Sequence, residues 1–487
     1  MTTSISATGS ISAAGLGSGL DVNSIVAGLM EVESQPLTLL QNTASSLNTQ
    51  VSAFGQLQSL MSGMRDAANA LTSLSLWNQT TSSSADASSV AVTTTGGAVA
   101  GSYSVSVQKL AASQTISSSA FASADTAVGQ GTLTIELGAW GSGADAGSFT
   151  AKAGSPPLTI TIGPDDTSLA SIRDKINGAG AGVTATIVND ASGARLAIRS
   201  SSTGAENGFR ITGTETAGDG NPGAGLAALS YDAADGATPM QLNQSAGNAA
   251  ATINGIAVSS ASNTLDGVAD GLTLTLQKTT SADVAVSVSA DSGAVTGALN
   301  KFVSAFNSLS NYIHTQTKYD PTSKTGGVLQ GDTTVNSLLS QMRNVINQQN
   351  TAGGAYSMLS DVGISMQADG TLAVNSTKFS AAVANRADLK TLFAASGDTT
   401  AATGFMTRFR QLGDSVLGVD GSIPTRESSL QTMLKRNSDS QEAMQQRLDQ
   451  TQARLLAQYQ ALDTSMAQLN STSAYLTQQL AQLNKTV

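Results

Sequence analysis

The sequence predicts an α+β protein of several domains: a helical coiled-coil leg built from both chain ends, with an inserted β-rich head of two modules. Three observations predict it. Apolar residues recur at helical spacing near both ends, and short runs of alternating polar and apolar residues fill positions 80–288. Leucine recurs every seventh residue near the C-terminus. A chain of 487 residues has room for about three or four domains.

Changes in composition along the chain divide it further. We expect a helical leg, a helical stalk and two head modules, each of which combines distant segments. The leg pairs 1–42 with 425–487, the stalk pairs 43–79 with 289–424 (which includes a β-hairpin), the inner head module pairs 80–114 with 246–288, and the outer module, β-rich with one helix, is 115–245.

Three alternate glycines open the chain, in "GLGSGLDVNSIVAGLM" at residues 15–30. A dinucleotide-binding loop would need a further glycine where Leu20 stands and a strand before the loop, and both are missing. We therefore interpret these glycines as a hinge before a helix that Asp21 caps. Pro36 should interrupt that helix.

A longer helix follows Pro36, with apolar residues three, four or seven positions apart until near Trp77. This stripe predicts a packing or assembly face. The candidate interface residues on it are Leu40, Leu47, Phe54 and Met61.

The head reads as short strands, such as "GSYSVSVQKLA", "GTLTIELG" and "PLTITIG", with one helix in "TSLASIRDKINGAG" and a hairpin that turns at residues 189–193. Asp165 and Asp166 precede that helix. Paired carboxylates suit acid–base chemistry, but acidic residues also favour a helix N-terminus, and we interpret this pair as capping residues.

The C-terminal heptads predict a long helix, about 54 Å over residues 448–483 at ~1.5 Å per residue. The second seam position, four residues later, holds Gln452, Tyr459, Met466, Ser473 and Leu480, so the seam should be weak alone. It could be a core stripe within one chain or an oligomer interface, and its length favours assembly. The candidate interface leucines are Leu448, Leu455, Leu462, Leu469, Leu476 and Leu483.

Composition argues against several functions. The chain has no cysteine and one histidine, His314, which lies in a helical pattern and reads as a surface residue. A net charge of −10 argues against nucleic acid, and we expect no catalytic site, metal or cofactor. Signal-peptide and membrane-span patterns are also missing, so we expect no membrane insertion and either a cytosolic location or export without a cleaved signal.

Several blocks together carry a family resemblance. "GLGSGLDVNSIVAGLMEVESQPL", "INGIAVSSASNTLDGVADGLTLTL" and "LSDVGISMQADGTLAVNSTKFSAAV" resemble, in order, the bacterial flagellar filament-cap family, also called the flagellar hook-associated protein 2 family. The stretch from "FVSAFNSLSNYIHTQTKYDPTS" to "NSLLSQMRNVI" and the C-terminal helix continue the match. "TSLASIRDKINGAGAGVTATIVNDASGARLAIRS" is similar to a strand–helix–hairpin module of flagellins and related axial proteins.

The resemblance implies a non-enzymatic protein that promotes ordered flagellin polymerisation at the distal filament tip and prevents loss of flagellin, as motility requires. It implies a homo-oligomeric ring, most commonly of five subunits, with flagellin and hook–filament junction proteins as partners. Export through the flagellar type III apparatus with a cytosolic chaperone would fit the lack of a signal peptide.

Two alternatives remain open at this stage. A surface adhesin could bind host glycans through the β head, alone or in addition to capping. A flagellin or a hook–filament junction protein would share the same export system, although the five family blocks argue against it.

Overall fold

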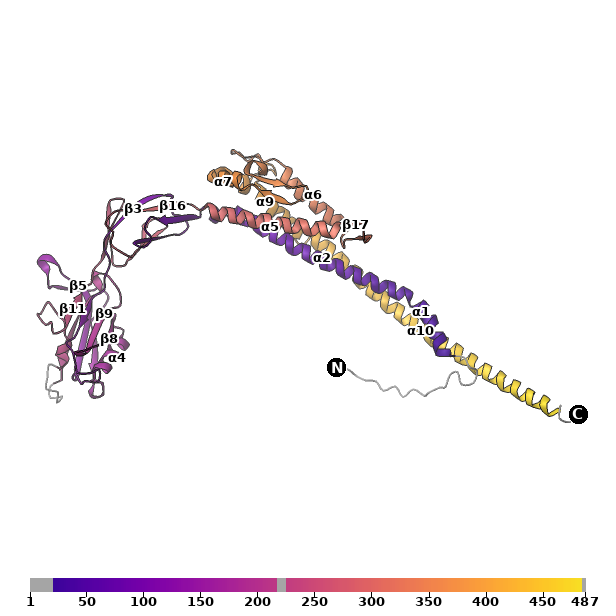
Figure 1. Ribbon diagram of the computed structural model, residues 1–487, viewed down its shortest axis with the longest axis horizontal. Coiled ribbons are helices and arrows are strands. Elements are labelled where there is room, and N and C mark those ends of the chain that lie inside the picture. Colours follow the sequence, from indigo (N-terminus) through magenta and orange to yellow (C-terminus); the bar gives the residue numbers. More distant parts are fainter. Residues whose placement is uncertain (1–20, 217–224, 484–487) are drawn as a thin grey trace. The chain divides into compact units, whose positions relative to one another are not determined.

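A computed structural model describes residues 21–216 and 225–483 of the chain, which divides into two compact units (Figure 1). The helical unit combines residues 1–77 with 292–487, and the β unit comprises residues 78–291. Segments from both ends of the chain therefore fold in one unit. This confirms the predicted layout of helices at both ends around a β-rich middle.

Helices dominate the helical unit. They are α1 (Val22–Glu33), α2 (Gln35–Thr72), α3 (Leu74–Trp77), α5 (Ser292–Thr317), α6 (Thr333–Asn347), α7 (Ser376–Ala384), α8 (Arg386–Ala394), α9 (Phe405–Leu417) and α10 (Ser422–Leu483). Two short hairpins, β17–β18 (Tyr319–Asp320 and Thr325–Gly326) and β19–β20 (Ile364–Met366 and Leu372–Val374), lie between them. The predicted divisions at 42/43 and 424/425 fall inside α2 and α10, and the domain boundaries stay predictions.

The start of the first helix and its break follow from local chemistry. The Asp21 carboxylate accepts hydrogen bonds from the Ser24 amide (3.1 Å) and the Ser24 hydroxyl (2.6 Å), as an N-cap does. Helix α1 ends at Glu33, and Pro36 lies in the first turn of α2, where its missing N–H leaves no hydrogen bond unmade. Both predictions, the Asp21 cap and the interruption at Pro36, are confirmed.

One apolar core holds the helical unit together. The buried faces of α2, α5 and α9 meet in it, joined by α6, α7, α8 and the start of α10. Phe302, Phe306 and Phe409 lie at its centre, with ring centroids 5.1 to 6.3 Å apart. Each fully buried phenylalanine contributes about 1.5–3 kcal/mol relative to an exposed one, so this core stabilises the unit.

The β unit contains sixteen antiparallel strands among its described residues, and one α-helix, α4 (Leu169–Ala179). The strands are β1 (Thr80–Ser84), β2 (Val90–Thr94), β3 (Gly101–Lys109), β4 (Thr115–Ser117), β5 (Gly131–Trp140), β6 (Phe149–Ala151), β7 (Leu158–Ile162), β8 (Val183–Asp190), β9 (Gly193–Ser200), β10 (Gly208–Glu215), β11 (Gln241–Gln244), β12 (Ala249–Ile253), β13 (Ile256–Ser260), β14 (Thr264–Ala269), β15 (Leu272–Leu276) and β16 (Val284–Ala290).

These strands enclose two separate apolar cores. One core lies between the sheets β1-β16-β3-β12-β13 and β14-β15-β2. The other lies between the sheet of β10, β5, β6 and β7 and the sheet β11-β4-β9-β8, and it includes the apolar face of α4. Inward-facing residues alternate along the strands, as Val105 and Val107 do on β3. The β unit thus has the two predicted modules.

The start of α4 corrects one prediction. Asp165 and Asp166 do not cap the helix, because they lie in a separate 3₁₀ turn (Pro164–Asp166). The cap is Ser168, whose hydroxyl accepts from the Ser171 amide at 3.1 Å. Asp166 instead forms an ion pair with Lys175 at 2.8 Å. The predicted hairpin turn is confirmed, since Asp190 pairs with Gly193.

Candidate assembly surface

The two chain ends form a leg of paired helices. Helix α10 lies beside α2 and then beside α1 (Figure 1). The Gln441 side-chain amide donates to the Leu40 carbonyl at 3.5 Å and to the Asn437 carboxamide oxygen at 2.6 Å. The sequence numbers rise along α10 as they fall along α2 and α1, so the helices run antiparallel. The predicted pairing of the chain ends is therefore present within one chain.

The predicted interface residues on α2 fall into two groups. Phe54 and Met61 are fully buried in the core of the helical unit. Leu40 and Leu47 are half-buried, and Leu47 packs against that core. A role of these four side chains at an interface between chains stays a prediction.

The leucines on α10 differ in exposure along the helix. Leu448 is buried and Leu455 is half-buried, whereas Leu462 is 47%, Leu476 55% and Leu469 64% exposed. The side chain of Leu483 lies outside the described part of the structure. With Met466 and Leu480, which are also exposed, these three leucines form what we call the distal stripe: Leu462, Met466, Leu469, Leu476 and Leu480.

Helix register explains why the distal stripe is exposed. Counted from the contact between Gln441 and Leu40, the start of α1 lies level with about residue 459 of α10. Val22 and Val26 of α1 are buried there. Past this point the described residues offer α10 no partner helix, although its leucine repeat continues over a further ~27 Å. A contiguous exposed apolar stripe of this kind marks an interaction site.

The distal stripe and the residues around it carry almost no charge. Between residues 462 and 483, Asp463 is the sole charged residue, and Gln, Ser, Thr and Ala fill the positions around the apolar ones. A partner helix would therefore be held by apolar contact and not by ion pairs. Salt weakens interactions between exposed charges, and this binding would involve no ion pairs. Its strength should therefore depend weakly on ionic strength.

An ion pair anchors the base of α10. Arg426 Nε lies 2.9 Å from Asp332 Oδ2, and the Asp332 side chain is nearly buried. The same carboxylate caps α6, because its other oxygen accepts from the Thr334 amide at 2.9 Å. Asp is a common cap at the start of a helix. The ion pair could not be predicted, since nothing in the sequence links two residues this far apart.

A second arginine, Arg408 on α9, was missed by sequence reasoning. It is buried, and its guanidinium donates to three backbone carbonyls, those of Gln348 (2.9 Å), Gln349 (3.2 Å) and Ala401 (3.0 Å). Burial lowers the pKa of Arg408 from its ordinary value. The residue ties two loops to α9, which is a structural role. The sequence of an amphipathic helix does not show which of its arginines will be buried in this way.

Other sites considered from the sequence can be placed as follows. Gly15, Gly17 and Gly19 lie outside them. His314 is an exposed residue of α5. Within residues 21–216 and 225–483, no three His, Cys, Asp or Glu side chains cluster as metal ligands would. None of the described helices combines the length and the apolar character of a membrane span.

Family models match three parts of the chain. The model of the flagellar hook-associated protein 2 N-terminus matches residues 18–114, and that of its C-terminus matches residues 246–471. A flagellin hook IN motif matches residues 148–202, which include β6, β7, α4, β8 and β9.

Relatives with the same description align over most of the chain. The flagellar hook-associated protein 2 of Escherichia coli strain K12 is 31% identical, over 91% of this chain and 92% of its own. The B-type protein of Pseudomonas aeruginosa is 30% identical, over 88% and 87%. A crystal structure of the D1–D2–D3 domains of the flagellar cap protein FliD from E. coli matches with a TM-score of 0.58 and 28% identity, covering 78% of this chain and 99% of that one.

Proposed function

This chain belongs to the flagellar hook-associated protein 2 family, and from that premise we propose that it is the structural cap of a bacterial flagellar filament. The observation that carries the proposal is the match to named relatives over nine-tenths of both chains, together with a fold shared with a flagellar cap protein. As the cap it promotes ordered flagellin polymerisation, which filament elongation and motility require. The similarity to these relatives supports capping and gives no support to adhesion, so the adhesin alternative is no part of the proposal.

We further propose that the distal stripe is the contact by which the leg engages the filament end. A growing cap must hold the filament tip and still move after each subunit is added. An uncharged stripe that one polar seam residue, Ser473, interrupts suits this requirement, because it can separate from a partner helix without breaking ion pairs. Flagellin helices at the tip are the partner that we infer for it.

The cap should act as a ring of identical subunits, and we propose a pentamer at the distal tip. The other proposed partners follow from the same assembly route. They are the hook–filament junction proteins on which the first cap would sit, the flagellar type III export apparatus, and a cytosolic export chaperone.

A strain that lacks its own copy of the gene tests the proposal. We expect it to secrete unpolymerised flagellin and to lack filaments, and we expect the wild-type chain to restore both. A variant with Leu462, Leu469 and Leu476 replaced by Ala should be exported but should leak flagellin. The matched control replaces three exposed polar residues on the opposite face of the same helix, Gln460, Thr464 and Gln468, by Ala and should behave as the wild type.

Three results would count against these proposals. Normal filaments in the deletion strain would remove the capping function. Normal filaments with the leucine variant, or equal leakage from the polar control, would show that the stripe does not make the contact.

A further inference from the structure

One strand of the β unit, β7, has an edge with which no second strand pairs in the described structure. Strand β7 pairs with β5 along one edge, from Leu158 opposite Ile135 to Ile162 opposite Gly131. In the parts of the chain that the structure describes, no other strand pairs with it. In an antiparallel pair, alternate residues direct their N–H and C=O groups away from the partner strand. Strand β7 therefore presents an open row of backbone donors and acceptors.

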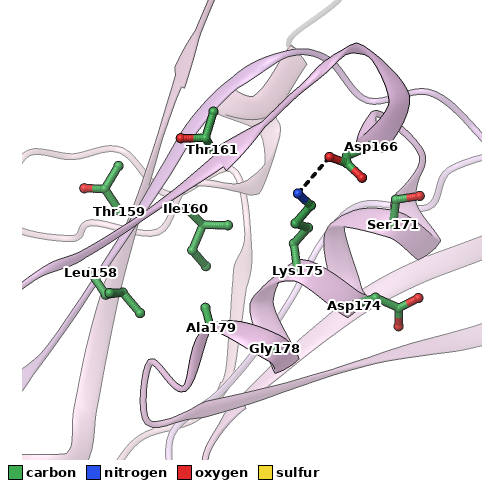
Figure 2. A pocket seen from close by; sticks show the side chains of 10 residues that line it. All are labelled: Leu158, Thr159, Ile160, Thr161, Asp166, Ser171, Asp174, Lys175, Gly178 and Ala179. Atoms are coloured by element: carbon green, nitrogen blue, oxygen red, sulfur yellow. Dashed lines mark ion pairs between the residues drawn. The ribbon is translucent and has the colours of Figure 1, made fainter.

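The open edge faces a groove of about 820 Å³ between β7 and α4 (Figure 2). Ile160 is buried beside it and Leu158 is half-buried. Ser171, Gly178 and Ala179 of α4 line the opposite side. These small side chains keep the helix from filling the space beside the strand.

The charges around the groove neutralise one another. Lys175 Nζ lies 2.8 Å from Asp166 Oδ2, as Figure 2 shows, and Arg173 Nη2 lies 2.7 Å from Asp174 Oδ1. No charged group that lines the groove lacks a partner of opposite sign. An uncharged ligand is therefore the better match, and a charged small molecule would have to compete with existing ion pairs.

The pairing with β5 shows which side chains suit β7. Thr159 lies opposite Thr134, Ile160 opposite Leu133 and Thr161 opposite Thr132, so hydroxyl meets hydroxyl and aliphatic meets aliphatic. The free edge carries the same residues and should prefer the same alternation. Exposed edges are commonly protected by lysine, proline or a bulge, and β7 has none of these within Leu158–Ile162.

We propose that this groove binds an extended, uncharged segment of another protein, one that alternates Ser or Thr with aliphatic residues and adds to β7 as a further strand. Main-chain hydrogen bonds would supply the affinity, and the Thr159–Thr161 stretch would supply the preference for alternation. The site lies in the β unit and does not depend on the proposed role of the distal stripe.

A peptide-binding measurement on the full-length protein tests the proposal. The probe is an acetylated, amidated peptide with the β5 sequence of residues 131–135 (GTLTI), labelled with a fluorophore and followed by fluorescence anisotropy. The blocking variant is Gly178→Trp, because a Cβ at Gly178 meets no atom within 4 Å and the indole has room to enter the groove. Gly178→Ala is the matched control, and circular dichroism checks that both variants are folded.

We expect saturable binding to the wild type and to Gly178→Ala, and at least about tenfold weaker binding to Gly178→Trp, as loss of one or two backbone hydrogen bonds would give. Two further peptides carry N-methyl groups on alternate amide nitrogens, one on the odd and one on the even positions. One of them should lose binding and the other should keep it, because alternate amides of an added strand face β7. No binding to the wild type, equal binding to Gly178→Trp, or the same result with both methylated sets would overturn the proposal. So would self-association of the protein that Gly178→Trp abolishes without any peptide binding, because the occupant would then be a second copy.

Discussion

The proximal part of α10 (residues 422–448) and its distal part (residues 462–483) belong to one helix but meet different surroundings. The proximal part buries Ile423 and Leu430 in the core of the helical unit, and Leu448 beside the other leg helices. The distal part carries leucines in the same seven-residue repeat, yet more than half of Leu469 and of Leu476 is exposed. The difference shows that a heptad repeat predicts a helix and the face that can pack. Whether that face is covered depends on where the partner helix begins.

The largest expected effect comes from removing a proximal leucine. Leu430→Ala should lower the free energy of unfolding of the helical unit by about 2–5 kcal/mol, because the side chain is fully buried and its loss leaves a cavity. Leu469→Ala is the matched distal change and should alter it by less than about 0.5 kcal/mol. Urea denaturation followed by circular dichroism measures both. Equal losses would mean that the distal stripe is covered in the free protein.

The anchor at the base of α10 should give a smaller effect. Asp332→Ala removes both the α6 cap and the ion pair with Arg426, so we expect a loss of about 1–2 kcal/mol in the free energy of unfolding. Asp332→Asn keeps a side-chain oxygen for the cap and should lose about half as much. The same denaturation experiment tests this, and a smaller loss for Ala than for Asn would contradict it.

A buried polar residue of the proximal part sharpens the comparison further. Asn437 is buried, and its carboxamide oxygen accepts from Gln441, which also contacts Leu40. Replacing it by Leu should raise the free energy of unfolding by about 0.5–1 kcal/mol, because an apolar side chain suits a helix seam better. The register between α10 and α2 should become less specific. Cysteine crosslinking between positions 40 and 441 in both backgrounds would show this, and an unchanged crosslinking pattern would argue that Asn437 does not set the register.

Sequence patterns predicted the parts of the fold that depend on local chemistry. Helix faces, the Asp21 cap and the hairpin at Asp190–Gly193 follow from residue spacing and capping rules, and each is confirmed. One local prediction failed. Ser168, and not an aspartate, caps α4. A shift of two or three residues is too small for pattern reading to resolve.

Long-range contacts could not be predicted in this way. The Arg426–Asp332 ion pair and the three carbonyls around Arg408 join residues that no local rule connects. The open edge of β7 was equally hidden, because the sequence "PLTITIG" reads the same for an edge strand as for a central one. Whether a strand lies at an edge depends on the order in which the strands pair, and that order is a property of the whole β unit.

The smallest expected effect concerns pH and the start of α1, where the leg changes from paired to unpaired. The side-chain hydrogen bond from Ser24, followed by that from the Ser24 amide, lowers the pKa of Asp21 below its ordinary value. Because the pKa of Asp21 is lower in the folded protein than in the unfolded chain, the cap stabilises α1 fully at pH values above the ordinary carboxylate pKa. This stabilisation is lost as the pH falls through the pKa that Asp21 has in the folded protein. The first turn of α1, with Val22 and Val26, should therefore fray below about pH 4 while the core of the helical unit persists. Backbone chemical shifts of residues 22–26 in a pH titration measure this. Asp21→Asn keeps a cap oxygen that does not titrate, so its α1 should be insensitive to pH in this range. Fraying of the Asn variant at the same pH would assign the change to another group.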